Sequence, residues 1–376
     1  NVTSYRGVAL DMAFFPQVGM GPVNQFSAFS KQLKTDKEFD LNRIVNGMKR
    51  VIIGSFKKIV IADGLGVFVN TCFDYPANER TVFLAWMGGI CFLLQEYNDF
   101  SGYSDVSIGT GLIFGYTSDE NFRYPFASRS ISEFWQRWHI TLGAWLKTYI
   151  YVPLVIKFIK VKNPLTKKKL SPLAGDMLAL FVTWLVCGAW HGRGPKYILW
   201  GMYFFVFLAA EHIVMFKNKE KTKEKARIER QNRNQAVASQ IDETVVANRR
   251  ANRILPVLHR FAGHVYALLA ILMGETLFRA ATLHDFGAYF KNMIGIGSTT
   301  LINNYNVMEF RNYVVLFVIS IITAFPIFEK LGSIRFVKEH EVIREAVLDI
   351  FLLGLLCVDI AFAFIGTYSA FIYNQF

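Results

Sequence analysis

Two Trp-His dipeptides, Trp138-His139 and Trp190-His191, hold the side chains best suited to chemistry in this chain. A histidine ring takes up and returns a proton near neutral pH, which is the task of a general base in acyl transfer. Both dipeptides lie in a chain dominated by apolar segments, and an ionisable ring at membrane depth is a functional-site hypothesis. The alternative is a histidine at a helix end whose ring is held by a carbonyl group and takes no part in chemistry.

The composition of the chain is that of a multi-span membrane protein. Of its 376 residues, 53% are hydrophobic and 15% are aromatic. A helix crosses the hydrocarbon core with about 20 mostly apolar residues. Period-2 alternation is absent, so the apolar windows are expected to be helices. These windows are 44–70, which Lys57 and Lys58 interrupt, and 81–95, 174–190, 197–216, 261–278, 312–328 and 347–366.

Positive charge is concentrated in two short stretches beside these windows. The net charge is +12, and segments 157–169 and 217–253 account for all of it with a balance of +6 each. Lysine and arginine are enriched in cytoplasmic loops, so both segments are predicted to be cytoplasmic and to attract anionic membrane lipids. This placement argues against nucleic acid as a partner. Segment 217–253 is predicted to be a charged linker, either a solvated helix or disordered.

The four cysteines, Cys72, Cys91, Cys187 and Cys357, lack the spacing of a metal site. We therefore expect no metal and no bound cofactor, and interpret the cysteines as small buried hydrophobes. Cys187 precedes His191 by four residues, so an acylated thiol nucleophile is the alternative interpretation.

Polar residues also follow the apolar run 81–95. Asn98 and Asp105 belong to segment 96–105, and they are expected either to form a structural hydrogen-bond network or to line a tunnel. Further along the chain, Glu275 and Arg279 are spaced i, i+4 and are predicted to pair within one span.

The spans also predict where the two histidines lie. Segment 1–43 is expected to form short helical pieces and turns. Segment 138–156 is expected to lie along the cytoplasmic face or to dip into it, with Pro153 interrupting its helix. The hairpin turned by 192–195 places His191 between the middle of the membrane and its outer face, whereas His139 is expected near the cytoplasmic face.

Several motifs in a fixed order resemble the membrane-bound O-acyltransferase family, and more narrowly its bacterial branch of alginate O-acetylation and teichoic acid D-alanyl transfer proteins. The resemblance covers almost the whole chain. It is carried by Phe14-Phe-Pro-Gln17, Asp99-Phe-Ser-Gly-Tyr-Ser-Asp105, Glu120-Asn-Phe-Arg-Tyr-Pro125, Ser132-Glu-Phe-Trp-Gln-Arg-Trp-His-Ile-Thr-Leu142, Gly188-Ala-Trp-His-Gly192, Leu199-Trp-Gly201 and Tyr368-Ser-Ala-Phe-Ile-Tyr-Asn-Gln-Phe376.

The resemblance implies an all-α, polytopic fold: a ring of tilted transmembrane helices around a thinned centre with a tunnel. It implies one integral membrane domain over 1–376, with the N-terminal spans that precede Phe14 in the family missing. It also implies catalytic roles for His191, the histidine of the Trp-His-Gly motif, and for His139. Trp138, Trp190, Asn98 and Asp105 are the residues predicted to line the tunnel or the substrate site.

The function implied is O-acyl transfer, most simply of an acetyl group, onto a cell-wall or exported polysaccharide at the plasma (inner) membrane. The donor is expected to be acetyl-CoA or an acyl-carrier thioester, and the partner an SGNH-type acetyltransferase or an acyl-carrier protein. D-alanyl transfer to teichoic acid is one alternative. The other is a non-enzymatic transporter or scaffold, since broken helices and polar groups at the membrane midplane occur there too.

Overall fold

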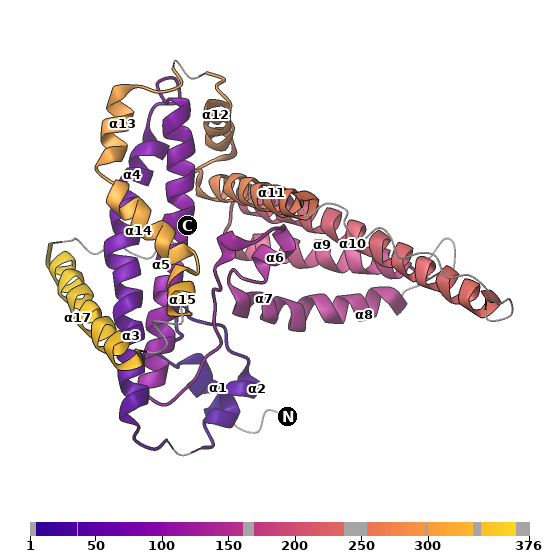
Figure 1. Cartoon of the computed structure of the whole chain (residues 1–376), viewed down its shortest axis with the longest axis horizontal. Helices are drawn as coiled ribbons and strands as arrows, with labels where there is room; N and C mark the ends of the chain where they lie inside the picture. The colour runs from indigo at the N-terminus through magenta and orange to yellow at the C-terminus, as the bar shows by residue number, and fades with distance from the viewer. Residues whose placement is uncertain are drawn as a thin grey trace. The chain divides into compact units, whose positions relative to one another are not determined.

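The computed structural model shows a chain built from helices and their connections (Figure 1). The structure describes residues 5–35, 37–160, 169–236, 254–297, 300–333 and 340–365. Over these residues it contains no β-strand, so the predicted all-α class is confirmed. The ring of helices and its tunnel stay a prediction.

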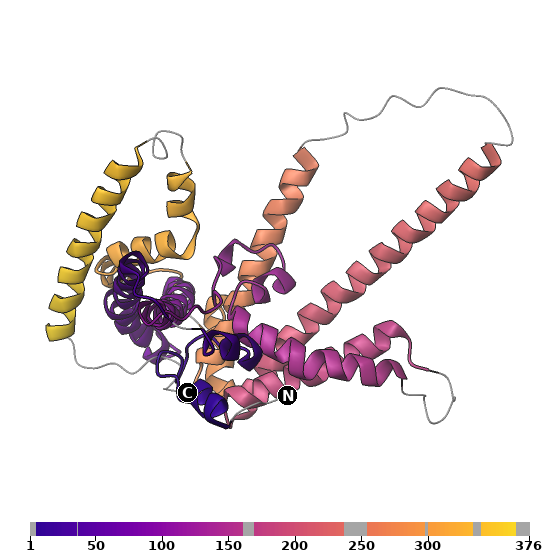
Figure 2. The ribbon, with the colours of Figure 1, turned by 90° about the horizontal axis from the view of Figure 1, so that it is seen from below.

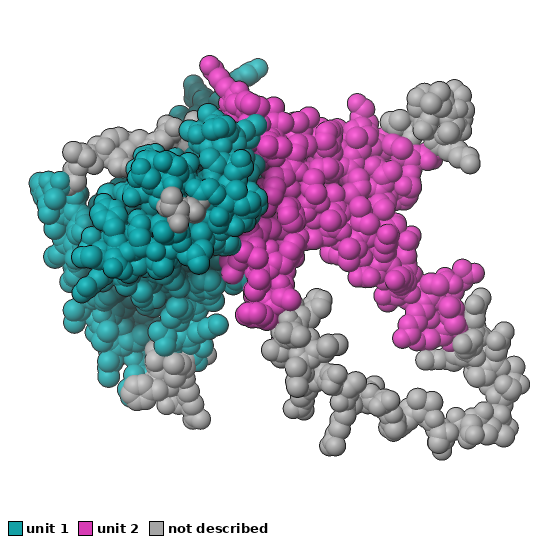
Figure 3. Space-filling model, turned by 90° about the horizontal axis from the view of Figure 1, so that it is seen from above, with its two compact units in different colours: residues 1–127, 135–146, 271–376 teal, residues 128–134, 147–270 magenta. Residues whose placement is uncertain are grey.

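By their contacts the residues divide into two compact units, coloured separately in Figure 3. Unit 1 comprises residues 1–127, 135–146 and 271–376, and unit 2 comprises residues 128–134 and 147–270. The predicted single membrane domain stays a prediction.

Unit 1 is organised around one long buried helix, α5 (Val82–Ile113), which Thr81 caps by accepting a hydrogen bond from the backbone N–H of Leu84. Two helices and a π-helical turn, α3, η1 and α4, run beside it. The helical segments of this unit are α1 (Tyr5–Met12), α2 (Phe26–Gln32), α3 (Leu41–Ser55), η1 (Phe56–Ala62), α4 (Asp63–Asp74), α5, η2 (Pro125–Ala127), α7 (Ile140–Leu146), α12 (Leu283–Met293), α13 (Asn304–Arg311), α14 (Val314–Ala324), α15 (Ile327–Gly332) and α17 (Glu341–Ile365).

Glycines allow α3 to lie directly against α5. A Cβ atom at Gly54 would lie 2.5 Å from the carbonyl oxygen of Gly102, and one at Gly47 would lie 2.6 Å from that of Gly109. Such distances leave no room for a side chain, so the two backbones approach each other closely. This approach brings the charged side chains of α3 and η1 next to the polar stretch of α5.

Unit 2 contains the hairpin formed by α9 (Pro172–His191) and α10 (Pro195–Ala236). The predicted turn at 192–195 is confirmed, with Pro195 as the first residue of α10. α10 is one uninterrupted helix of 42 residues (Figure 2). Predicted linker 217–253 therefore begins as a helix, and its residues 237–253 lie outside the described residues. η3 (Lys147–Tyr151) and α8 (Val152–Lys160) also belong here, whereas α6 (Ile131–Trp135) and α11 (Ile254–Arg279) run from unit 2 into unit 1.

Five helices in the described residues are long and apolar enough to cross a membrane, or six if a bent pair counts as one span. They are Ile140–Lys160, Pro172–His191, Pro195–Arg230, Arg260–Arg279, Glu341–Ile365 and the pair Asn304–Arg311 with Val314–Ala324. The windows predicted at 174–190, 197–216, 261–278 and 347–366 correspond to four of these helices. Residues of the lysine-rich segment between 161 and 168, and the motif at 368–376, lie outside the described residues.

Two expectations about the helices were wrong, and a third is met only in part. Window 312–328 contains α14, which Pro326 separates from α15, and α14 counts as a candidate span only together with α13, from which it is bent by 61°. Pro153 does not interrupt its helix, because the π-helical turn η3 just before it provides the local adjustment that its missing N–H requires. Arg279 hydrogen-bonds to Asn70 rather than pairing with Glu275.

Candidate active site

His139 lies in unit 1 between α6 and α7, in a strained backbone conformation. Its φ is +44°, and Tyr124 on the neighbouring loop has a φ of +48°. The left-handed region is costly for residues other than glycine and clusters at functional sites. Two backbone hydrogen bonds hold the pair of loops together, from Arg123 N to Arg137 O and from Ile140 N to Asn121 O, each 2.9 Å long.

Asn121 fixes the imidazole of His139. The side-chain Oδ1 of Asn121 lies 3.0 Å from Nδ1 of His139 and also accepts hydrogen bonds from the hydroxyl and the backbone N–H of Thr141. Its Nδ2 donates to the hydroxyl of Ser104 on α5, at 3.1 Å. All of these side chains are buried, so the ring is held by a polar network inside an apolar surrounding.

Aromatic rings surround this network on the side of Trp138. The indole of Trp138 meets Phe122 edge to face at 5.0 Å between ring centroids, and the ring of Phe100 meets His139 at 4.6 Å. Trp138 is only 4% exposed, and it is not among the described residues that line the adjacent cavity. Its contacts are those of a packing residue that supports His139, and its predicted lining role stays untested.

A cavity of about 770 Å³ lies beside the loop that carries Asn121. One part of its wall is polar and includes Arg50, Lys57, Asp105 and Asn121. The other part is apolar and comes from α14, α15 and α17. An amphipathic cavity of this size can hold a small molecule with both a charged and an apolar portion. Asp105, a predicted lining residue, is thus at the cavity wall.

Four charged side chains form an ion network in this wall. Asp105 accepts from Nη2 of Arg50 at 2.9 Å and from Nζ of Lys57 at 2.7 Å, and Arg50 also donates to Glu120. Both cations come from the α3 and η1 segment that the glycine contacts press against α5. Close pairing of partly buried charges fixes their side-chain positions and keeps the wall polar.

Asn98, the other polar residue predicted on α5, has a different environment. It is fully buried, its Nδ2 donates to Leu94 O, and its Oδ1 accepts from the hydroxyl of Thr323 on α14. It is not among the described residues that line the cavity. These contacts favour the structural alternative of a hydrogen-bond network that joins α5 to α14.

His191 lies in unit 2 as the last residue of α9. Its ring contacts the indoles of Trp190 and Trp200, with centroids 5.0 Å and 4.8 Å apart. α10 approaches α9 closely at Gly188. A Cβ atom there would lie only 2.5 Å from Tyr197 O, so only glycine permits this approach. Trp190 is 60% exposed. His139 and His191 belong to different units.

The sequence interpretation missed several polar residues that the structure places in networks. Asn121, Arg50 and Ser104 were not singled out, although Asn121 belongs to the 120–125 motif and Arg50 is a cation inside an apolar window. In unit 2, Asp176 accepts hydrogen bonds from Tyr151 and from Nδ1 of His212, the latter at 3.2 Å. An acidic residue in a span was the signal for this second network.

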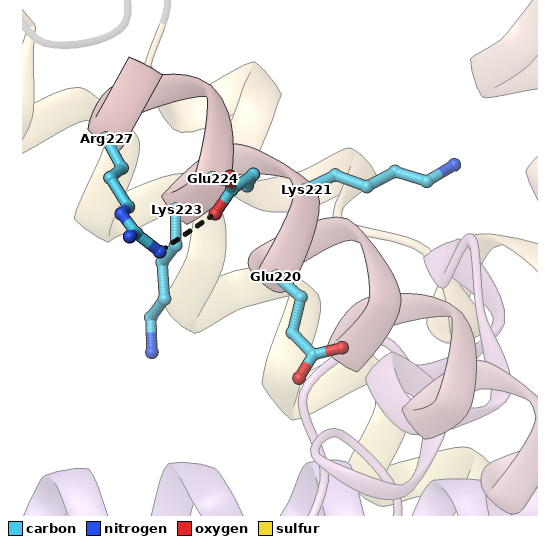
Figure 4. Close-up of a pocket in the computed structure, with 5 residues that line it drawn as sticks. All are labelled: Glu220, Lys221, Lys223, Glu224 and Arg227. Atoms are coloured by element: carbon cyan, nitrogen blue, oxygen red, sulfur yellow. Dashed lines mark ion pairs between the residues drawn. The ribbon is translucent and has the colours of Figure 1, made fainter. Parts of the chain in front are cut away.

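A shallow hollow on α10 is formed by Glu220, Lys221, Lys223, Glu224 and Arg227 (Figure 4). All five side chains come from one exposed helix, and the pair drawn between Arg227 and Glu224 spans 3.9 Å. Such an i, i+3 pair stabilises the helix slightly. With side chains from a single helix and no buried polar group, the hollow offers no enclosed site for chemistry.

Comparison with known proteins identifies the family to which the chain belongs. The profile of the membrane-bound O-acyltransferase (MBOAT) family matches residues 12–224, a range that includes His139 and His191. The chain belongs to this family, and the resemblance drawn from its motifs is confirmed. It is accordingly an all-α membrane protein.

The similar curated proteins modify polysaccharides or related polymers by name. The chain is 32% identical over 290 residues to "Probable alginate O-acetylase AlgI" of Pseudomonas fluorescens, covering 77% of this chain and 48% of the relative. It is 36% identical over 208 residues to the "Peptidoglycan O-acetyltransferase" of Helicobacter pylori, covering 54% and 36%. It is 32% identical over 216 residues to the "Teichoic acid D-alanyltransferase" of Bacillus subtilis, covering 55% and 51%. The chain thus spans about half the length of the AlgI relative.

Proposed function

We propose that this protein is a membrane O-acyltransferase that transfers an acetyl group for the O-acetylation of a cell-wall or exported polysaccharide. The observation that carries the proposal is the family match over residues 12–224, because it includes both histidines. The names of the relatives from Pseudomonas and Helicobacter support acetyl as the group transferred. The site of action is the plasma (inner) membrane.

In this proposal His191 is the general base. The acceptor hydroxyl gives its proton to the imidazole while its oxygen attacks the thioester carbonyl, and the C–S bond then breaks. The imidazolium returns the proton to the leaving thiolate, so ester and thiol are the products. The ring contact with Trp200, which is only 2% exposed, supports this role, because a buried apolar wall excludes the water that would hydrolyse the thioester.

His139 orients the donor. Its Nδ1 faces Asn121 Oδ1, so Nε2 is the nitrogen that carries the lone pair of the neutral ring. The cavity beside Asn121 has the polar and apolar wall that an acyl thioester with a polar carrier arm requires. The donor is acetyl-CoA or an acyl-carrier thioester, and the partner on the polymer side is an SGNH-type acetyltransferase.

D-alanyl transfer is the second candidate, and the Bacillus relative is the observation that favours it. Its donor would be a D-alanyl thioester on an acyl-carrier protein, and its acceptor a teichoic acid. The acetyl proposal has priority because the alginate-type relative from Pseudomonas fluorescens matches 77% of this chain, whereas the Bacillus subtilis D-alanyltransferase matches 55%.

One experiment separates the two candidates. Proteoliposomes that contain the protein receive isotopically labelled acetyl-CoA or a labelled D-alanyl carrier thioester, and release of the carrier thiol is measured together with label transferred to added polysaccharide or teichoic acid. The same vesicles with His191→Ala protein serve as the matched control. Transfer of D-alanine alone would replace the acetyl assignment, and equal transfer by the control vesicles would contradict both.

A further inference from the structure

A second cavity of about 340 Å³ lies within unit 1, and neither His139 nor His191 is among the described residues that line it. It is formed where α4 ends, where α11 ends and where α12 begins. Its volume is at the lower end of small-molecule sites, which measure about 300–1,000 Å³. The residues that give it chemical character are Asp74, Tyr75, Arg80, Arg279, Asp285 and Tyr289.

The wall of this cavity contains two stacked aromatic rings, each with an arginine over it. The guanidinium of Arg80 lies 4.6 Å from the ring centre of Tyr289, and that of Arg279 lies 5.1 Å from the ring centre of Phe73. The two rings are stacked on each other at 4.3 Å. Each cation therefore has a fixed orientation before any ligand arrives.

Arg80 is buried without a carboxylate. It is 4% exposed, and its guanidinium donates to the carbonyl oxygens of Cys72, Phe73 and Tyr75 and to the side chain of Asn292. In the described part of the chain no acidic oxygen lies within ion-pair distance of it. Burial lowers the pKa of this guanidinium below its ordinary value. An arginine nevertheless stays charged, and all its hydrogen-bond partners are neutral, so the carboxylates of Asp74 and Asp285 act on it only through space.

Arg279 is the second cation of the cavity. Among the described residues its only hydrogen bond runs from Nη2 to Asn70 Oδ1, at 2.8 Å. A guanidinium has five N–H donors, so donors of Arg279 are available to a ligand. Arg279 is also the last residue of the candidate span Arg260–Arg279, so the cavity lies at the end of a helix that is long and apolar enough to cross a membrane.

The two carboxylates of the cavity lie at its exposed part. Asp74 and Asp285 are both exposed, whereas Arg80 is buried. Asp285 accepts from the backbone and hydroxyl of Thr282, which fixes it at the start of α12. The cavity thus has no net charge, with Arg80 buried, Arg279 half-buried and both carboxylates toward the solvent.

We propose that this cavity binds a zwitterionic phosphoethanolamine headgroup, with the phosphate at Arg80 and Arg279 and the ammonium at Asp74 and Asp285. Arginine is suited to phosphate oxygens, and a primary ammonium donates charge-assisted hydrogen bonds to carboxylates. A simple anion would be repelled by the two carboxylates. A zwitterion instead pairs its phosphate with the two arginines and its ammonium with the two carboxylates. The position at the end of a span favours a phospholipid as the source of the headgroup. The proposal is independent of acyl transfer.

The first test uses the purified full chain in detergent and soluble headgroups as probes. Isothermal calorimetry compares glycerophosphoethanolamine with glycerophosphocholine and glycerophosphoglycerol. We expect the first to bind at least tenfold more tightly than the other two, because choline has no N–H donor and glycerol has no positive charge. Equal binding of glycerophosphoglycerol would overturn the role of the carboxylates. Absence of binding by all three would overturn the site.

Variants locate the binding. Arg279→Gln and Asp74→Asn change partly or fully exposed side chains and are expected to fold, and each should weaken binding of glycerophosphoethanolamine at least tenfold. Arg311→Gln is the matched control, since Arg311 ends α13 and is exposed but does not line the cavity. Unchanged affinity in both cavity variants would contradict the assignment.

A second arm distinguishes the sources of the headgroup. The protein and its Arg279→Gln variant are placed in nanodiscs of mixed phosphatidylethanolamine and phosphatidylcholine, and the lipid retained after extraction is quantified by mass spectrometry. Enrichment of phosphatidylethanolamine by the unaltered protein and not by the variant supports a lipid source. Binding of the soluble headgroup without lipid enrichment supports a soluble phosphoethanolamine compound, and equal lipid retention by both proteins without soluble binding contradicts the proposal.

Discussion

The imidazole Nδ1 of His139 lies 3.0 Å from the amide Oδ1 of Asn121. The amide orientation follows from chemistry, because the same oxygen accepts from the backbone N–H of Thr141, which can only donate. Nδ1 of the neutral ring must therefore carry the proton, and Nε2 carries the lone pair. A buried amide thus selects the tautomer of a candidate catalytic histidine.

This relationship makes Asn121 a positioning residue whose loss can be measured. Asn121→Ala removes the acceptor for His139 and for Thr141, so the ring loses its fixed tautomer and orientation. We expect thioester consumption to fall about tenfold to a hundredfold, within the range associated with partners that orient histidines. Turnover is measured per folded protein in proteoliposomes.

Asn98→Ala is the matched control for that experiment. It removes another buried asparagine of unit 1, whose partner is Thr323 rather than a histidine. This variant is expected to be less stable to heat and to keep its turnover per folded molecule. Equal loss of turnover in both variants would indicate that only packing was disturbed.

The backbone of His139 yields a prediction about stability. At a φ of +44°, glycine has no steric penalty, whereas alanine has the penalty of the left-handed region. His139→Gly is therefore expected to be more stable than His139→Ala by about 1 kcal/mol. Thermal unfolding in detergent gives the order of the two variants.

The two His139 variants also separate strain from chemistry. Both lack the imidazole, so both should have the same reduced acyl transfer, although their stabilities differ. If relief of strain restored transfer in the glycine variant, the backbone rather than the ring would be the functional feature. A reversed order of stability would contradict the strained conformation.

The sequence predicted the parts of this protein that depend on local patterns. Apolar length predicted the helices of 174–190 and 261–278, and the Gly-Arg-Gly-Pro turn predicted where α9 ends and α10 begins. The motif with His139 was also recognised. These features are encoded by consecutive residues, whose hydropathy and turn preferences act over a few positions.

Pairings between distant segments were not predictable in the same way. Arg50 and Asp105 are 55 positions apart, and they meet because glycines at 54 and 102 let α3 approach α5. Nothing in the spacing of Glu275 and Arg279 reveals that Asn70 is the better partner. Such contacts depend on the packing of whole helices, which periodicity alone does not specify.

The ion network of the large cavity gives a prediction about paired charges. Asp105→Asn leaves Lys57 without its partner, whereas Lys57→Met leaves Asp105 still bonded to Arg50. An unpaired charge in a largely buried position is strongly destabilising. We therefore expect the apparent unfolding temperature to fall more for Asp105→Asn than for Lys57→Met.

The double variant completes this test. Lys57→Met combined with Asp105→Asn removes the unpaired lysine charge, so part of the lost stability should return. The three variants and the unaltered protein form a double-mutant cycle. Strictly additive losses would show that the two side chains do not interact.

The charged extension of α10 is predicted to be dispensable for acyl transfer. Its ion pairs, such as the one between Lys225 and Glu229 at 4.0 Å, lie within one helix. The side chains at 217–230 are almost all exposed, so few packing contacts would be lost. Replacing 217–253 by a Gly/Ser linker of equal length should leave turnover within about twofold, since a flexible connection is tolerated at little cost.

Membrane levels of the linker variant must be measured alongside turnover. Full loss of transfer at normal levels would show that the extension has a direct part in the reaction. A sequence-scrambled version of 217–253 with the same charges is the control, because it retains any attraction to anionic lipids.

The role of His191 is the most direct prediction about chemistry. Its ring lies at the end of α9 against Trp190 and Trp200, and a general base in such a position contributes about 10²–10⁴ to the rate. His191→Ala should therefore lower acyl transfer at least a hundredfold without loss of folded protein. His191→Gln retains hydrogen-bonding groups but cannot accept the proton, so it should be equally impaired.

His284→Gln is the control for this experiment. It changes a highly exposed histidine, 91% accessible at its side chain, and should leave transfer unchanged. Near-normal transfer by His191→Gln would mean that the ring has a structural role, because an amide can replace a hydrogen bond but not a base.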